Sequence, residues 1–224
     1  MKIPNTMERD CLLDEIRAEV LDTQRFTGVP ELEQRVMEAL RQTPRDEFVP
    51  HELRYGAYAN RPLPIGHGQT ISQPYVVALM TGLIQPQPED VVLEIGTGSG
   101  YQAAILSPLV KQVYSMEIIE ELAGQASERL QRLGYYNVDV RTGNGRLGWP
   151  EHAPYDAILV TAAATRVPPA LIEQLKPGGT LVIPVGLQHV AQDLLVIRKR
   201  SDGSLEEKHV LPVVFVPLTG SPCD

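Results

Sequence analysis

The sequence predicts an α/β protein with a doubly wound, mostly parallel sheet, because apolar runs of strand length alternate with helical patterns from residue 74 to residue 185. Strands joined through helices form right-handed crossovers, which make neighbouring strands parallel and cover both faces of the sheet. Residues 191–216 differ, because they contain two strand-like segments joined at Ser201-Asp202-Gly203-Ser204. This hairpin signal predicts antiparallel C-terminal strands at one edge.

The N-terminal part predicts two amphipathic helices and a long connection. Apolar residues recur at helical spacing at Leu12, Leu13, Ile16 and Val20, and after Pro30 at Leu32, Val36, Met37 and Leu40. Residues 44–74 are rich in Pro, Gly and single aromatics. A connection of that length is usually functional or disordered, and its apolar content favours a functional loop.

The elements expected after this loop alternate regularly along the chain. They are helices over 75–84, 101–109, 119–133 and 169–174, and strands over 91–95, 112–116, 138–141, 157–161, 180–185, 191–200 and 207–216. A turn is expected at Lys176-Pro177-Gly178-Gly179. We expect one compact domain, in which residues 1–74 supply added N-terminal helices and a candidate active-site loop, and residues 75–224 form the core.

The composition is that of an ordinary globular protein and disfavours nucleic acid as a partner. Of its 224 residues, 43% are hydrophobic and 21% are charged. A chain of this length and composition can bury a hydrophobic core. Its 28 acidic and 20 basic residues give a formal net charge of −8, whereas phosphate binding needs clustered positive charge. Apolar stretches stay shorter than the roughly 18 residues of a membrane span, and the acidic N-terminal region is unlike a signal peptide. We therefore expect no nucleic-acid or membrane partner.

The two cysteines indicate a reducing compartment. Cys11 and Cys223 lie near opposite ends of the chain and show no metal-ligand spacing. Two free thiols fit this arrangement better than a disulfide framework. We expect a cytoplasmic, monomeric or weakly associating protein without a metal site.

The strongest functional signal is a buried strand that runs into a glycine-rich turn over Gly96–Gly100 and then into a helix. In an open α/β sheet, ligands bind beyond the carboxyl ends of the strands, where glycines let a ligand approach the backbone. Glu117 closes the next strand roughly 20 residues further on, where such folds hold ribose hydroxyls. The alternative is a tight turn that binds nothing.

The glycine spacing separates two classes of cofactor. Dinucleotide-binding proteins use G-x-G-x-x-G, whose helix N-terminus faces a pyrophosphate. Here Glu94, Gly96, Gly98 and Gly100 form E-x-G-x-G-x-G. A carboxylate before the turn would repel pyrophosphate and tolerate the sulfonium cation of S-adenosyl-L-methionine. The alternative for Glu94 is a solvated or helix-capping acid.

These motifs resemble a known family. The turn from Glu94 to Gly100, with Glu117, resembles the Rossmann-like fold of class I methyltransferases. The segment Pro64-Ile65-Gly66-His67-Gly68-Gln69-Thr70-Ile71-Ser72-Gln73-Pro74 is similar to the signature of protein-L-isoaspartate O-methyltransferases. Further matches lie at Asn144-Gly145, over 155–163 and over 215–219, so the resemblance covers about residues 44–219.

The resemblance implies an enzyme that uses S-adenosyl-L-methionine to methylate the free α-carboxylate of L-isoaspartyl residues in damaged proteins, which initiates their repair, and it leaves open whether D-aspartyl residues are also substrates. The residues that it implies for the methionine end and the reacting centre are Gln69, Thr70, Ile71, Ser72 and Val77. The remaining cofactor-binding residues that we expect are Glu94, Gly96 and Gly98 at the turn, Glu117 and Ile118 at the ribose, Asn144 and Gly145 at the adenine, and Thr219, which closes the site. The family usually has Asp-Gly at the position of Asn144-Gly145, and an amide oxygen can accept the same hydrogen bond.

Ser72 is the candidate catalytic residue, as a hydroxyl that orients the substrate carboxylate. A carboxylate is already ionised at neutral pH, since its reference pKa is about 4, so methyl transfer requires no general base. The alternative for Ser72 is the N-cap of a helix that starts near Pro74, and one hydroxyl could serve both roles. His67 is either a structural loop residue or a substrate-facing one.

Three competing functions remain open on the sequence. A methyltransferase of the same fold could act on a small molecule or on another protein group. A non-catalytic cofactor-binding domain is favoured if the Gln69–Ser72 segment lies far from the glycines. A nicotinamide-dependent oxidoreductase is disfavoured by the glycine spacing.

Overall fold

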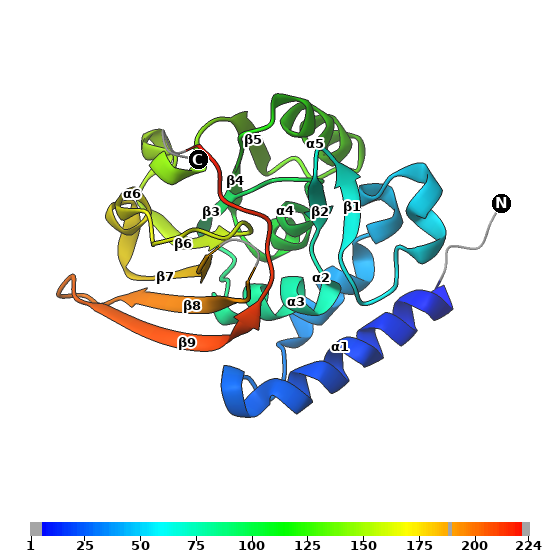
Figure 1. Cartoon of the computed structure of the whole chain (residues 1–224), viewed down its shortest axis with the longest axis horizontal. Helices are drawn as coiled ribbons and strands as arrows, with labels where there is room; N and C mark the ends of the chain where they lie inside the picture. The colour runs from blue at the N-terminus through cyan, green and yellow to red at the C-terminus, as the bar shows by residue number, and fades with distance from the viewer. Residues whose placement is uncertain (1–5, 188–189, 221–224) are drawn as a thin grey trace.

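A seven-stranded sheet forms the centre of the structure, a computed structural model that describes residues 6–187 and 190–220. The strand order is β5-β4-β3-β6-β7-β8-β9 (Figure 1). The strands are β3 (Val91–Ile95), β4 (Gln112–Glu117), β5 (Val138–Thr142), β6 (Tyr155–Val160), β7 (Leu175–Val185), β8 (Gln192–Lys199) and β9 (Leu205–Val213).

The predicted fold class is confirmed. Strands β5, β4, β3, β6 and β7 are mutually parallel, whereas β8 and β9 add antiparallel pairings at one edge. The chain leaves β3 for β4 and β5 on one side and returns to β6 on the other side. A topological switch point therefore lies at the carboxyl end of β3, which is where open α/β sheets bind ligands.

Helices cover both faces of the sheet. They are α1 (Thr6–Thr27), α2 (Gln34–Gln42), α3 (Pro74–Leu83), α4 (Tyr101–Leu106), α5 (Glu120–Arg132) and α6 (Pro169–Glu173), with short 3-10 turns η1 (Arg45–Phe48), η2 (His51–Gly56), η3 (Ser107–Leu109), η4 (Gly145–Leu147) and η5 (Pro150–His152). Because successive strand residues point to opposite faces, Val92 joins the apolar cluster under α1 to α4, while Leu93 joins the cluster under α6. The first cluster contains residues from both the N-terminal segment and the core.

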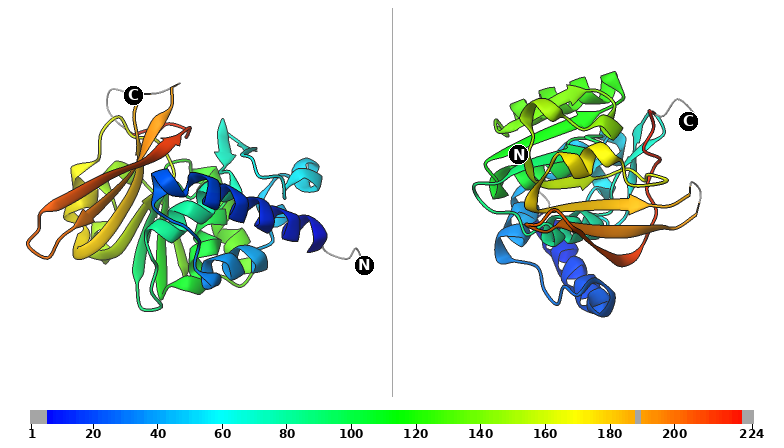
Figure 2. Two further views of the ribbon diagram at one scale, coloured as in Figure 1. Left: turned by 90° about the horizontal axis from the view of Figure 1, so that it is seen from below. Right: turned by 90° about the vertical axis from the view of Figure 1, so that its left-hand side faces the viewer.

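Helix α1 lies on the outside of the helical layer (Figure 2). Its buried apolar residues are those predicted from the helical spacing, namely Leu12, Leu13, Ile16 and Val20. The hydroxyl groups of Thr23 and Tyr75 are hydrogen bonded at 2.6 Å, which joins α1 to the first turn of α3. At its end, Lys208 Nζ of β9 donates to the carbonyl oxygen of Thr27 at 2.7 Å. Contacts to both α3 and β9 therefore fix the position of α1.

Two predictions about local structure were wrong. The segment expected to be a long loop without strands contains a hairpin, β1 (Leu63–Gly66) and β2 (Gln69–Ile71). Its two central residues, His67 and Gly68, have φ angles of 52° and 69°, and positive φ at both positions is the requirement of a type I′ hairpin turn. The turn expected at residues 176–179 lies inside β7, where the pairing with β6 shifts register. The predicted hairpin between β8 and β9 is confirmed.

Arg45 is fully buried, although the sequence marks it only as a charged residue beside a proline. Its guanidinium donates to the carbonyl oxygens of Ala57 at 2.9 Å, Arg61 at 3.3 Å and Ser72 at 2.8 Å. It also lies 4.8 Å from the ring centroid of Tyr101. Burial lowers the pKa of Arg45, and the nearby Tyr101 opposes this shift. One buried cation thus joins η1, η2 and the residue that follows β2.

We expect Arg45→Met to lower the free energy of unfolding by roughly 3 kcal/mol, because three buried or partly buried hydrogen bonds to carbonyl groups are lost at about 1–3 kcal/mol each. Urea denaturation followed by circular dichroism measures this loss. The control is Arg25→Met on the exposed side of α1, which should change stability by less than about 0.5 kcal/mol. Equal effects of the two substitutions would show that Arg45 does not hold the segment.

Candidate active site

A cavity lies at the predicted place, beyond the carboxyl ends of β3, β4 and β6. It holds about 770 Å³ of empty space that opens to solvent. The predicted site residues that line it are Gln69, Thr70, Ile71, Ser72, Val77, Gly96, Gly98, Glu117, Ile118, Gly145 and Thr219. The segment after β9 returns across the sheet to the side of the β1–β2 hairpin (Figure 1), so residues from distant parts of the sequence meet here. The Gln69–Ser72 segment therefore lies beside the glycines.

The glycine-rich turn is shaped by close contact with the neighbouring strand β6. Gly96 and Gly98 have φ angles of 97° and 52°, in the left-handed region that glycine adopts without strain. A Cβ atom on Gly96 would lie 2.5 Å from Oγ1 of Thr161, which is closer than atoms can approach. The Thr161 hydroxyl donates to the carbonyl oxygen of Gly96 at 2.6 Å. The end of β6 thus supports the turn from behind.

Glu117 supports the same turn from the other side. Its carboxylate accepts the backbone N–H of Gly98 at 2.8 Å through Oε2, and that of Ile119 at 3.1 Å through Oε1. The side chain is buried apart from the part that faces the cavity. Each carboxylate oxygen has further acceptor capacity, so the group can take two more hydrogen bonds without moving. A fixed pair of acceptors suits two neighbouring hydroxyl groups.

Glu94 lies behind the turn and is fully buried, so the interpretation as a solvated acid is wrong. The Ser115 hydroxyl donates to its Oε2, and Ser115 is in turn hydrogen bonded to the Thr97 hydroxyl at 2.6 Å. Within the described part of the chain its Oε1 has no partner. Burial raises the pKa of Glu94 to about 8, and the charge of Glu117 adds to the shift while the bond from Ser115 opposes it. Glu94 is absent from the residues that line the cavity, and its contact with a ligand stays a prediction.

Asn144 also lies behind the cavity wall. Its amide nitrogen donates to the carbonyl oxygen of Gly220 at 2.7 Å, and its Oδ1 accepts the N–H of Arg146 at 3.0 Å. The side chain therefore caps η4 and holds the C-terminal segment close to Gly145. A Cβ atom on Gly145 would lie 2.2 Å from Cγ2 of Ile95, so this position requires glycine. The adenine contact expected for Asn144 stays a prediction.

Ser72 lies where the first cavity meets a second one. It lines both, and its hydroxyl makes no hydrogen bond within the described residues. Its carbonyl oxygen is held by Arg45 at 2.8 Å. Helix α3 begins at Pro74 with Gln73 as its N-cap residue, so the alternative of Ser72 as the N-cap is wrong. The hydroxyl is left available for a ligand.

The second cavity holds about 1010 Å³ of empty space, which also opens to solvent. It is bounded by α1, the start of α3 and the end of β9. Its shared wall with the first cavity consists of Thr70, Ser72, Thr161 and Val216. Two molecules bound side by side would therefore meet at this wall.

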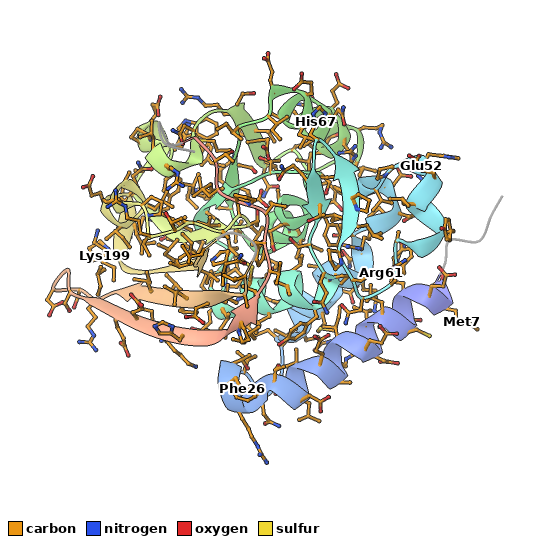
Figure 3. The ribbon with its side chains drawn as sticks, in the orientation of Figure 1. Met7, Phe26, Glu52, Arg61, His67 and Lys199 are labelled. Atoms are coloured by element: carbon orange, nitrogen blue, oxygen red, sulfur yellow. The ribbon has the colours of Figure 1, made fainter. Side chains whose placement is uncertain are left out.

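Several lining residues were missed by the sequence reasoning. Thr161 follows β6 directly, and the adjacency of parallel strand ends is the signal that could have found it. Tyr101 and Gln102 lie in the first turn of α4, immediately after the glycines. His67 lies at the exposed tip of the hairpin and lines neither cavity (Figure 3), which favours its structural role in the turn.

Residues 6–187 and 190–220 hold no group of three or more His, Cys, Asp or Glu side chains that could bind a metal ion. Cys11 is an exposed free thiol, and Cys223 lies outside the described residues. Within the described part of the chain, the helices are too short or too polar to cross a membrane.

Known proteins resemble this chain over most of its length. The model of the family described as protein-L-isoaspartate(D-aspartate) O-methyltransferase matches residues 16–222. Protein-L-isoaspartate O-methyltransferase 2 of a Polaromonas species is 58% identical over 93% of this chain and 99% of its own length. Protein-L-isoaspartate O-methyltransferase 1 of Cupriavidus necator is 55% identical over 95% of this chain and 82% of its own length.

Two solved structures are also similar to this chain. A protein-L-isoaspartate O-methyltransferase aligns with a TM-score of 0.81 at 28% identity over 95% of this chain, which spans 66% of that protein's chain. A putative protein-L-isoaspartate O-methyltransferase from Plasmodium falciparum, solved in complex with S-adenosyl-L-homocysteine, aligns with a TM-score of 0.76 at 24% identity over 93% of this chain and 97% of that chain. The second likeness shows the shared fold. On the family match and the identity to its members, this chain belongs to the protein-L-isoaspartate(D-aspartate) O-methyltransferase family.

Proposed function

We propose that this protein transfers a methyl group from S-adenosyl-L-methionine to the free α-carboxylate of L-isoaspartyl residues in damaged proteins, which initiates their repair. The observation that carries the proposal is the place of Ser72, whose hydroxyl lies on the shared wall of two cavities and has no hydrogen-bond partner among the described residues. Family membership supports the reaction and the substrate class. We further propose a cytoplasmic monomer that also accepts D-aspartyl residues, and the exposed free thiol of Cys11 fits a reducing compartment.

The first cavity fits the cofactor in its chemistry. Glu117 offers two fixed acceptors to the hydroxyl groups of a ribose. The lining residues that the structure describes include no Lys or Arg, which a pyrophosphate would favour, so a dinucleotide fits less well. When bound, S-adenosyl-L-methionine supplies a methyl group activated by the sulfonium cation. The same cavity contains the glycine-rich turn and the Gln69–Ser72 segment, which argues against a remote loop and a purely cofactor-binding role.

We assign the cavity residues to the parts of the cofactor as the family resemblance implies. We assign Gln69, Thr70, Ile71, Ser72 and Val77 to the methionine end and the reacting centre, Gly96 and Gly98 to the backbone contact, Glu117 and Ile118 to the ribose, Gly145 to the adenine, and Thr219 to the closing segment. For Glu94 and Asn144 we propose indirect roles. Glu94 acts through Ser115 and Thr97 beneath the turn, and Asn144 acts through η4 and Gly220.

The chemistry requires orientation rather than proton transfer. The isoaspartyl α-carboxylate is ionised at neutral pH, because its reference pKa is about 4. Its oxygen forms the new bond to the methyl carbon while the carbon–sulfur bond breaks and its electron pair goes to sulfur. We propose that the Ser72 hydroxyl donates to one carboxylate oxygen and leaves the other in line with the methyl group. Such positioning lowers barriers by up to roughly 7–11 kcal/mol.

Substrate choice is the direct test of this function. Isoaspartyl and aspartyl peptides carry equal charge, so discrimination depends on hydrogen bonds to a backbone that is one methylene longer. We expect the isoaspartyl peptide to be methylated at least about a thousandfold more efficiently than its aspartyl twin, as hydrogen-bonding sites can achieve. Transfer of a radiolabelled methyl group to the two peptides measures the ratio of kcat/KM. Equal methylation of both, or methylation of a small acid alone, would move the assignment to another methyltransferase of this fold.

Ser72→Ala tests the proposed reacting centre. We expect a drop in kcat of at least about tenfold, because one hydrogen bond to a charged group contributes about 1.5–3 kcal/mol. The affinity for S-adenosyl-L-methionine, measured by calorimetry, should change by less than about threefold, since the hydroxyl acts on the substrate. Ser204→Ala, in the exposed turn between β8 and β9, is the matched control and should leave both quantities unchanged. Unchanged kcat in the Ser72 variant would remove Ser72 from the reaction.

Glu117→Ala tests the ribose contact. We expect calorimetry to show cofactor binding weakened by roughly 1.5–3 kcal/mol, the value of charge-assisted hydrogen bonds. Loss of the bond to the Gly98 N–H acts in the same direction, because it frees the turn. Glu120→Ala is the control, since this glutamate lies nearby but is exposed on the first turn of α5. If both variants bind the cofactor as tightly as the wild type does, Glu117 is not a ligand.

A further inference from the structure

The second cavity contains a negative charge that has no cationic partner in the part of the chain that the structure describes. Among the described residues that line it, Glu19 of α1 alone is charged. Its Oε2 accepts hydrogen bonds from Asn60 Nδ2 at 2.8 Å and from Gln73 Nε2 at 3.2 Å. Both donors are neutral amides. The ion pairs found within residues 6–187 and 190–220 do not include Glu19.

The Glu19 carboxylate is held close to the proposed reacting centre. Gln73, one of its donors, directly follows Ser72 in the chain. Asn60, the other donor, accepts the backbone N–H of Tyr75 at 3.0 Å through Oδ1, which turns its amide nitrogen towards Glu19. The contacts of α1 with α3 and β9 fix the helix that carries the carboxylate. Its position in the cavity that Ser72 also lines is therefore set before any substrate binds.

This arrangement has a consequence for a peptide that reaches both cavities. Neutral donors do not neutralise a carboxylate, so the half-buried Glu19 side chain can attract a cationic group of a ligand. The rest of the second cavity is formed by neutral polar groups and apolar side chains such as Leu211, Val213 and Phe215. A lysine or arginine can place its methylene groups on that apolar wall and its charged end at Glu19. An acidic side chain at the same place would meet a like charge.

We propose that Glu19 is a specificity-determining residue that selects isoaspartyl sites with a lysine or arginine next to the isoaspartyl residue and disfavours sites with an acidic neighbour. This inference rests on the proposed function, because it assigns the second cavity to the residues that flank the methylated carboxylate. The carboxylate acts on the choice among substrates and takes no part in methyl transfer itself.

Two series of isoaspartyl peptides test the proposal, one varying the residue before the isoaspartyl residue and one varying the residue after it. Each series carries Lys, norleucine or Glu at the varied position, and kcat/KM is measured at low salt. In at least one series we expect the wild type to prefer Lys over Glu by about tenfold, since attraction and repulsion at a half-exposed charge each contribute a factor of about three. The preference should fall at high salt, because salt screens the charge.

Two variants and one control separate a charge effect from a structural one. Glu19→Gln should reduce the Lys-to-Glu ratio to about two or less, and Glu19→Lys should invert it. A general disturbance of α1 lowers kcat/KM for every peptide alike and leaves the ratio unchanged, so the ratio reports the charge alone. Glu128→Gln removes the same charge from the exposed side of α5 and should keep the wild-type ratio.

The outcomes distinguish this inference from the proposed function. If the wild type methylates none of the isoaspartyl peptides, the proposed function fails. If it methylates the norleucine peptides but shows the same Lys-to-Glu ratio as Glu19→Gln in both series, only the inference about Glu19 fails. A ratio that Glu128→Gln lowers as much as Glu19→Gln does would assign the preference to the net charge of the protein and would also overturn the inference.

Discussion

The site depends on the glycine-rich turn after β3, which is held from both neighbouring strands. Thr161 at the end of β6 contacts Gly96 so closely that a side chain cannot fit, and Glu117 at the end of β4 accepts the N–H of Gly98. These contacts exist because β3 lies between β4 and β6 in the sheet. The strand order thus converts a flexible glycine segment into a fixed wall, and the cavity forms in front of it.

Buried polar groups behind that wall connect the site to the rest of the fold. Glu94, Ser115 and Thr97 form a hydrogen-bonded row beneath the turn, and burial raises the pKa of Glu94, which favours the neutral form of this acid. A neutral acid avoids the large penalty of an unpaired buried charge. Arg45 stabilises the part of the cavity wall that contains Ser72, because its fully buried guanidinium donates to the carbonyl oxygen of Ser72. A change of either group would therefore affect stability and site geometry together.

The N-terminal helices do more than cover the sheet. Helix α1 supplies Glu19 and Thr23 to the second cavity, and its hydrogen bond to Tyr75 joins it to the helix that follows Ser72. The β1–β2 hairpin supplies Gln69–Ile71 to the lining of the first cavity, and the segment after β9 supplies residues 216–219. A core that binds a small cofactor thus acquires, from both ends of the chain, a second compartment large enough for part of a peptide.

The sequence by itself determined the helices and strands of the core and the glycine-rich turn on which the site is built. Periodicity of apolar residues located the strands and helices of the core to within a few residues, because burial on one or two faces leaves a regular pattern in the chain. The glycine spacing with Glu117 located the turn, since its backbone conformation requires particular residue types. The β1–β2 hairpin was missed, although the pair His67-Gly68 is compatible with its type I′ turn.

Only the tertiary structure decided which polar side chains face a ligand. Glu94 follows the family pattern and Asn144 replaces its usual Asp, yet both bond behind the wall, to Ser115 and Gly220, while Thr161 faces the cavity. Glu19 and Arg45 lie far in sequence from Ser72, and no local pattern distinguishes them from solvated charges. Their roles arise from contacts between distant segments, and such contacts follow from the packing of the whole chain rather than from the spacing of residues within it.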